Sequence, residues 1–149
     1  MSEAAPVRLV VFRVGKLLCA AEVAAVREIL PRLETTRIPG APPVVAGLVN
    51  VRGTLVTVVE GWRALGQPAP AGGENGGTTV LLDVGNGRQV AGFLVDEVTD
   101  LLTVTGDSLE GGPGLAGVDA TLVRAVGRRA GQLFVVLDTD ALLAPILSS

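Results

Sequence analysis

Residues 38–53 of this chain read IPGAPPVVAGLVNVRG, and residues 54–60 continue as TLVTVVE. The prolines and glycine at 39–43 favour a turn, because proline fixes φ and glycine tolerates positive φ. The apolar, largely β-branched residues at 47–51 and 54–60 are typical of two strands. Arg52-Gly53 lies between them at the position of a two-residue turn. This stretch therefore predicts a β-hairpin that is entered through a proline-rich loop.

Strand signals also dominate the chain on both sides of this hairpin. Residues 24–30 fit either a short helix or an irregular strand, and residues 141–147 are predicted to form a short C-terminal helix. Residues 1–6 and the sequence QPAPAGGENGG at 67–77 are expected to be flexible, because such compositions pack no core. The other strands are predicted at 7–14, 17–23, 78–84, 89–95, 101–105, 122–127 and 133–137.

The composition indicates an all-β protein with an aliphatic core. Hydrophobic residues make up 48% of the chain, but aromatic residues only 3%, and there are 20 glycines to serve tight turns. The mean hydropathy is +0.52. The net charge of −3 lacks the basic footprint of a nucleic-acid-binding protein. Because no apolar run approaches the ~20 residues of a membrane span and no signal peptide is evident, we expect a cytoplasmic protein without direct membrane insertion.

Two halves of the sequence resemble each other. A shift of 72 residues places Val26 on Val98, and a shift of 78 residues places Gly53 on Gly131. Other glycines and apolar positions follow the same two shifts, so the pattern predicts a duplicated unit of about 65–75 residues. The prediction is two similar β-barrels of about five short strands each. A single β-sandwich remains the alternative that the pattern leaves open.

The residues that carry chemistry argue against an enzyme. Histidine is absent and Cys19 is the single cysteine, which removes histidine-dependent nucleophile systems and thiolate metal clusters. Cys19 lies in an apolar run and is expected to be a buried, inert thiol. Asp138 and Asp140 precede a predicted helix, where capping explains them better than cation binding. Asp96 and Glu97 are adjacent on a predicted strand and should point to opposite faces. We therefore expect no catalytic site, metal or cofactor; a hydrolase that uses Asp96 or Asp138 is the remote alternative.

The sequence resembles the CheW-like domains of bacterial chemosensory proteins. Their usual pattern P-G-x-P-x-x-x-x-G-[ILV]-x-N-[LV]-R-G is similar to the segment at 38–53, and VREIL at 26–30, GFLVDEV at 92–98 and LDTD at 137–140 support the match. The resemblance covers residues 7–147 as one domain. It implies two intertwined five-stranded β-barrel subdomains with short helices. It also implies an adaptor that couples the helical hairpin tips of methyl-accepting chemoreceptors to the regulatory domain of a histidine kinase.

The resemblance also implies which residues meet each partner. The expected receptor-binding groove contains Val26, Glu28, Arg52, Val95 and Val98, and the expected kinase-binding residues are Gly47 and Asn50. From the residues alone, the three valines fit core and interface equally well. Arg52, with its planar guanidinium fork, fits either a partner's carbonyl or carboxylate or an internal acid.

This sequence departs from the family pattern directly after the hairpin turn. Thr57 replaces the usual proline, Glu60 the aspartate and Gly61 the leucine of V-P-[VI]-[IV]-D-L. The changes favour one alternative function, a variant adaptor that binds receptors but recruits kinase weakly or not at all.

Overall fold

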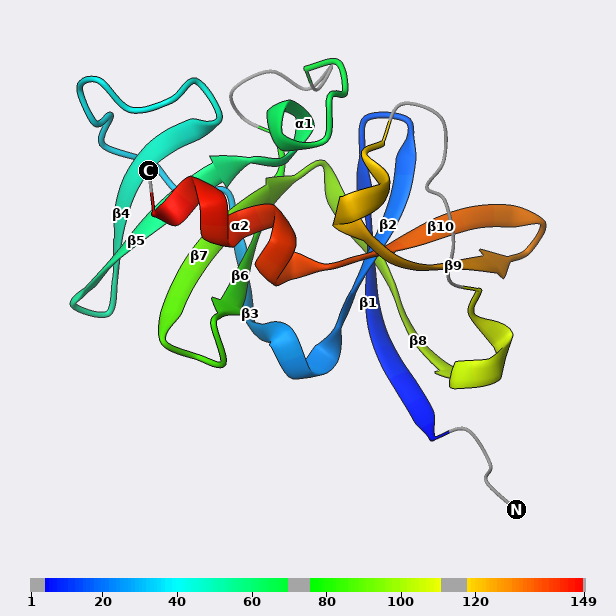
Figure 1. Ribbon diagram of the computed structural model, residues 1–149. Helices are drawn as coiled ribbons and strands as arrows, with labels where there is room; N and C mark the ends of the chain where they lie inside the picture. Colours follow the sequence, from blue (N-terminus) through cyan, green and yellow to red (C-terminus); the bar gives the residue numbers. More distant parts are fainter. Residues whose placement is uncertain (1–4, 70–75, 111–117, 149) are drawn as a thin grey trace.

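The computed structural model describes residues 5–69, 76–110 and 118–148, and most of the two segments expected to be flexible lies outside them. Almost all of the regular structure in these residues is β-strand (Figure 1). In chain order the elements are β1 (Pro6–Val14), β2 (Leu17–Glu22), η1 (Val23–Ala25), β3 (Val26–Pro31), β4 (Val45–Val51), β5 (Thr54–Glu60), α1 (Gly61–Ala64), β6 (Thr78–Val84), β7 (Gln89–Val95), β8 (Glu97–Thr105), η3 (Gly106–Ser108), η4 (Ala120–Leu122), β9 (Val123–Arg129), β10 (Gln132–Leu137) and α2 (Thr139–Leu147).

The strands form two five-stranded sheets (Figure 1). Sheet A has the order β8-β1-β2-β10-β9, and sheet B has the order β3-β6-β7-β5-β4. Neighbouring strands are antiparallel except for β2 with β10 and β5 with β7, which are parallel. Each sheet thus combines hairpins with one parallel pairing between strands that lie far apart in the sequence.

The predicted duplication and intertwining are both confirmed. β1–β5 with α1 are repeated as β6–β10 with α2, and each sheet takes two strands from one half of the chain and three from the other. The registers repeat as well. Cys19 pairs with Val135 in sheet A, and Ala91 pairs with Thr57 in sheet B, as the shifts of 72 and 78 residues require. The two sheets are therefore related by a pseudo-twofold relationship.

Each sheet curls until its two edges approach one another. The chain after β3 bridges to β4 through two hydrogen bonds of 2.8 Å between the backbones of Thr36 and Leu48. The chain after β8 bridges to β9 in the same way, between Glu110 and Val126. This gives both sheets a barrel-like form and distinguishes the fold from a single sandwich of two open sheets.

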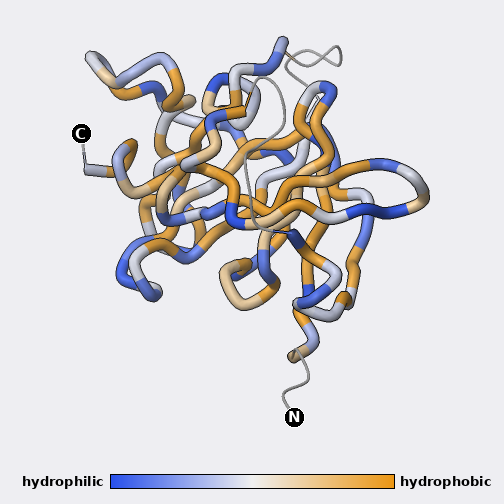
Figure 2. Tube along the Cα trace, turned by 45° about the vertical axis from the view of Figure 1, so that its right-hand side comes forward, coloured by the Kyte–Doolittle hydropathy of each residue, from blue (hydrophilic) through white to orange (hydrophobic). Residues whose placement is uncertain are grey.

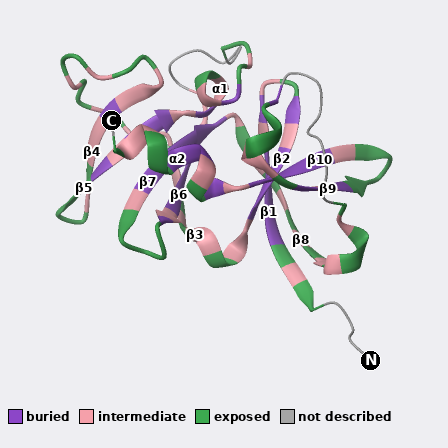
Figure 3. Cartoon of the chain, in the orientation of Figure 1, coloured by how far each residue is buried: buried purple, intermediate pink, exposed green. Residues whose placement is uncertain are grey.

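The main hydrophobic core lies between the two sheets. Phe12 of β1 and Phe93 of β7 are both fully buried and meet edge to face, with ring centroids 6.1 Å apart. Leu143 of α2 packs into the same cluster. Figure 2 shows the apolar residues concentrated where the strands cross, and Figure 3 shows the same region as buried. Each such side chain contributes about 1.5–3 kcal/mol when it is fully buried, so this shared core holds the two sheets together.

Three elements refine the predictions from sequence. The ambiguous segment 24–30 contains the single 3-10 turn of η1 followed by strand β3. The strand expected at 101–105 begins earlier, at Glu97, because β8 pairs with β1 along its whole length. The C-terminal helix is confirmed as α2. No helix in the described part of the chain has the length and apolar character needed to cross a membrane.

Candidate functional site

Arg52 occupies the turn between β4 and β5. Arg52 and Gly53 both have positive φ, +51° and +85°, as two-residue hairpin turns require. The Arg52 guanidinium donates two parallel hydrogen bonds to the carboxylate of Glu28 on β3, both of 2.5 Å. The hydrogen bond from Arg52 holds the pKa of Glu28 below its usual value, and Glu28 raises the pKa of Arg52. Because β3 and β4 are the two edges of sheet B, this ion pair joins the edges of the barrel.

Sheet A contains a corresponding ion pair. Asp100 of β8 is the residue that the repeat places on Glu28, and it pairs with Arg129 of β9. Ala130 and Gly131, at the positions of Arg52 and Gly53, again have positive φ. Both barrels are thus joined across their edge strands by an arginine at the hairpin turn and an acid on the third strand of the repeat.

Gly47 and Asn50, the expected kinase-binding residues, shape the β4–β5 hairpin. Gly47 is buried at φ +150°, and a Cβ there would lie 2.4 Å from the backbone oxygen of Thr36. The side-chain Oδ1 of Asn50 accepts a hydrogen bond of 2.7 Å from the backbone N–H of Gly53. Asn50 is nevertheless exposed. Gly47 therefore allows the close approach that closes the barrel, and Asn50 fixes a turn that a partner can reach.

The three valines expected in the receptor groove differ in their access to solvent. Val95 is 2% exposed and belongs to the core between the sheets. Val26 and Val98 are half-buried and pack against that core from β3 and β8. Val95 therefore supports the surface from beneath, whereas Val26 and Val98 contribute area to it.

Two exposed residues beside these valines were missed by the sequence reasoning. Ile29 of β3 is 42% exposed and Leu101 of β8 is 65% exposed. Their cross-strand partners, Val80 and Val10, belong to the core shared by the two sheets. Directly opposed residues lie on the same face of a sheet, so both side chains extend the inner faces outward to the edge strands. The 72-residue shift, which superimposes Ile29 on Leu101, is the signal that could have found them.

We call the exposed apolar surface on these two strands the edge-strand face. It carries the residues that the repeat superimposes in pairs. Its members are Val26, Ile29, Val98 and Leu101.

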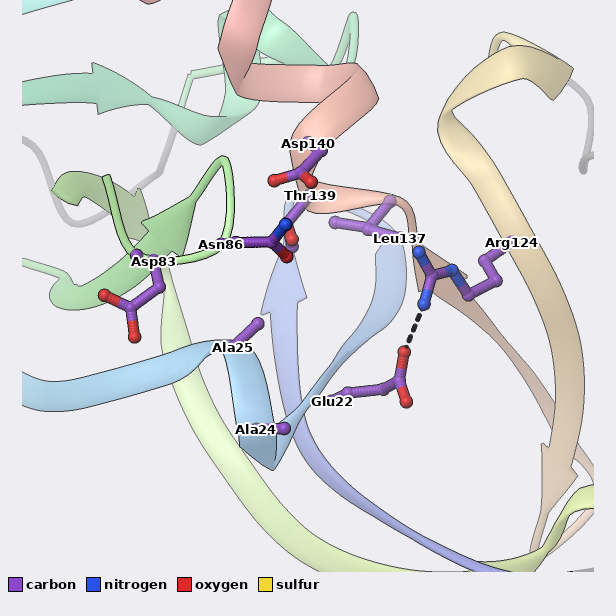
Figure 4. A pocket seen from close by; sticks show the side chains of 10 residues that line it. Glu22, Ala24, Ala25, Asp83, Asn86, Arg124, Leu137, Thr139 and Asp140 are labelled. Carbon is purple, nitrogen blue, oxygen red and sulfur yellow. Dashed lines mark hydrogen bonds and ion pairs between the residues drawn. The ribbon is translucent and has the colours of Figure 1, made fainter. Parts of the chain in front are cut away.

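A polar pocket of about 490 Å³ lies between the sheets on the side of α2 (Figure 4). Arg124 of sheet A and Glu22 form an ion pair of 2.5 Å across it. The carboxylate of Asp140 accepts a hydrogen bond of 3.0 Å from the backbone N–H of Gly85 in the β6–β7 turn. Asp83 is held by Arg27 at 2.8 Å. The acids that line this pocket are thus engaged in contacts within the chain that tie the two halves together.

The other carboxylates singled out from the sequence are also engaged. Asp138 caps α2 by accepting a hydrogen bond of 3.0 Å from the backbone N–H of Ala141, which confirms the capping interpretation. Asp96 and Glu97 do not diverge as expected, because both contact the guanidinium of Arg13, at 3.0 and 3.6 Å. The reason is that residue 96 lies at the crossover between β7 and β8 and not inside a strand.

A second, more apolar pocket lies on sheet B, between the proline-rich loop, the β4–β5 hairpin and the last turn of α2. Its volume is about 510 Å³. Thr57, one of the departures from the family pattern, forms part of its wall. The lining residues are Ile38, Pro39, Gly40, Ala41, Pro42, Val45, Thr57, Ile146 and Leu147.

Gly61, another departure, begins α1 and is buried. A Cβ at this position would lie 2.4 Å from the backbone oxygen of Leu94. The backbone here therefore leaves no room for the leucine that is usual in the family.

These surfaces suit protein docking better than chemistry. Within residues 5–69, 76–110 and 118–148, no three histidine, cysteine, aspartate or glutamate side chains come together in a group that could hold a metal ion. Cys19 is buried, and burial raises the pKa of its thiol to about 12, far from the range of a reactive thiolate. What remains accessible is an apolar face on β3 and β8, an arginine at its rim and an apolar pocket beside α2.

Comparisons with known proteins agree with this geometry. The model of the CheW-like domain matches residues 8–146. "Chemotaxis protein CheW" of Rhizobium meliloti is 31% identical over 134 residues, which cover 89% of this chain and 84% of that protein. "Chemotaxis protein CheW" of Klebsiella aerogenes is 27% identical, covering 90% and 80%. The crystal structure of the scaffolding protein TtCheW from Thermoanaerobacter tengcongensis superimposes with a TM-score of 0.84 at 22% identity, covering 93% and 88%.

Proposed function

This chain belongs to the CheW-like domain family, and from that membership we propose that it is an adaptor in a bacterial chemosensory complex, where it couples chemoreceptors to a histidine kinase. The observation that carries the proposal is the family match over residues 8–146, which includes both sheets and the hairpin with Arg52. The proposed role is to hold partners together and not to catalyse a reaction. The proposed location is the cytoplasm, where the tips of chemoreceptors are found.

The edge-strand face is the proposed docking site for the helical hairpin tip of a receptor. Helices bind grooves through a few apolar anchors, and charges at the rim add specificity. Val26 and Val98 supply half-buried apolar area, and Ile29 and Leu101 supply exposed anchors. Arg52 remains 70% exposed although it pairs with Glu28, so its guanidinium is available at the rim.

The β4–β5 hairpin and the apolar pocket beside α2 are the proposed docking site for the kinase regulatory domain. Asn50 is exposed at the end of β4, and Gly47 sets the path of that strand. The pocket places Thr57 beside Ile146 and Leu147 of α2. The proposed kinase site thus lies on sheet B alone, apart from the receptor face that both sheets build.

Two separate titrations of the purified protein test the proposal. One uses the hairpin-tip fragment of a chemoreceptor from the same genome, and the other uses the regulatory domain of the histidine kinase from that genome. Saturable binding to both supports the adaptor role. Binding to the receptor fragment alone would instead support the variant adaptor. Binding to neither, by protein that melts cooperatively, would defeat the proposed function.

Arg52→Ala and Arg63→Ala form a matched pair for the receptor titration. Both arginines are exposed and ion-paired, Arg52 with Glu28 and Arg63 with Glu60 at 2.9 Å, but Arg63 lies on α1. The Arg52 variant should bind the receptor fragment about 10-fold more weakly, because it loses a charged hydrogen-bond donor, and the Arg63 variant should bind normally. Equal effects of the two changes would exclude Arg52 from the site.

A further inference from the structure

The two exposed anchors of the edge-strand face occupy equivalent positions in the duplicated fold. Ile29 and Leu101 are related by the 72-residue shift, and both lie on the outermost strand of a sheet. The local geometry is also repeated, because each strand carries a bulge just before the anchor, one at Arg27 and one at Thr99. The two anchors are therefore presented by the same backbone shape.

The ion pairs on these strands have a common polarity. The arginine is more exposed than its acid in all three: 52% against 26% for Arg27 with Asp83, 70% against 29% for Arg52 with Glu28, and 49% against 33% for Arg129 with Asp100. Each acid thus lies beneath a guanidinium that faces solvent. Positive charge therefore accompanies both copies of the exposed apolar anchor, although the whole chain is acidic.

We propose that β3 and β8 carry two copies of one docking site, and that the partner is a pair of antiparallel amphipathic helices with acidic residues beside their apolar stripes, one helix for each copy. The inference rests on the proposed function and makes it more specific. It assigns Leu101 a role equal to that of Ile29, and it requires both helices of the receptor hairpin to make contact.

The pseudo-symmetry of the face selects this kind of partner. Two equivalent surfaces related by a twofold relationship are matched by a partner that has two similar surfaces related in the same way. Two antiparallel helices have that local symmetry, and each can offer an apolar residue to one anchor. Acidic side chains on the helices complement the outward guanidinium groups, which strengthens association mainly at low ionic strength.

Three serine substitutions test this inference with the same receptor hairpin-tip fragment. Ile29→Ser and Leu101→Ser each remove one anchor. Leu55→Ser is the matched control, because Leu55 is 67% exposed but lies on β5, on the far side of sheet B from β3. All three residues are exposed, so the variants should keep the melting temperature of the parent protein, which is measured alongside. Binding is measured by calorimetry at low and at high salt.

Each anchor substitution should weaken binding by about 10-fold, the loss expected for one apolar side chain buried by a partner. The double variant should show the product of the two losses, Leu55→Ser should bind normally, and the affinity of the parent protein should fall as salt is raised. Normal binding by Leu101→Ser, while Ile29→Ser is impaired, would overturn the inference and leave the proposed function intact. Affinity that does not fall with salt would overturn the acidic character of the partner. Failure of the parent protein to bind would defeat the proposed function and this inference together.

Discussion

Arg52 and Glu28 lie 24 residues apart and join the two edge strands of sheet B through a pair of parallel hydrogen bonds. The two interpretations of Arg52 from the sequence, internal pairing and partner binding, are therefore compatible. The guanidinium is held in a fixed orientation by Glu28 and is still 70% exposed. A partner would meet a charge whose direction is already set.

The Arg52–Glu28 pair should make stability depend on pH in the acidic range. The pKa of Glu28 is lowered from 4.5 in the folded protein, so its contribution is present above that value and is lost as the pH falls through the lowered pKa. Glu28→Gln should therefore melt slightly below the parent protein at neutral pH, and the difference should disappear well below pH 4.5. The effect is small because the pair is exposed and screened by solvent. Thermal melts from pH 7 downward provide the measurement.

Glu34→Gln serves as the control for that series, because Glu34 is an exposed acid on the chain that follows β3. Its melting temperature relative to the parent should not change with pH. A constant difference between Glu28→Gln and the parent across the whole range would show that the ion pair contributes nothing in solution.

Gly47 should be far less tolerant of alanine than Gly53. Both have positive φ, but a Cβ at Gly47 would strike the backbone of Thr36, whereas nothing lies within 4 Å of a Cβ at Gly53. Gly47→Ala should cost roughly 2–4 kcal/mol of unfolding free energy from strain and overpacking, and Gly53→Ala about 1 kcal/mol. Chemical denaturation of both variants compares them. Similar losses would show that closure of the barrel at Thr36 tolerates displacement.

Restoring the family's leucine at position 61 should harm this protein. The Cβ of Gly61→Leu would approach the backbone oxygen of Leu94 to 2.4 Å, so the start of α1 must shift. We expect a lower melting temperature and no gain in affinity for the kinase regulatory domain. A variant that is more stable and binds kinase more tightly would show that glycine here weakens kinase docking.

The thiol of Cys19 should be inert in the folded protein. It is fully buried in the core between the sheets, and burial raises its pKa to about 12. A disulfide exchange reagent at pH 8 should react only after guanidinium is added, because thiolate and access are both needed. Rapid reaction of the native protein, with its melting temperature unchanged, would show that the core opens readily.

The sequence allowed the strands, the repeat and the family to be predicted, because hydrophobic pattern and turn residues act locally. The exchange of strands between the two halves has no local signal: the pairing of β3 with β6, or of β1 with β8, depends on contacts between distant segments. Among the candidate site residues, Val26, Val95 and Val98 look alike in sequence. Only the packing distinguishes the buried Val95 from the other two.

The exchange of strands between the halves has a consequence for how this protein unfolds and how it arose. Because β1 and β2 depend on β8, β9 and β10, while β6 and β7 depend on β3, β4 and β5, neither half can complete a sheet by itself. Loss of either half exposes strand edges in both sheets, so the molecule should melt in a single cooperative step and damage in one barrel should weaken the other. A half-length ancestor would have needed a second copy of itself to bury its core, and duplication would have joined that obligate dimer into one chain.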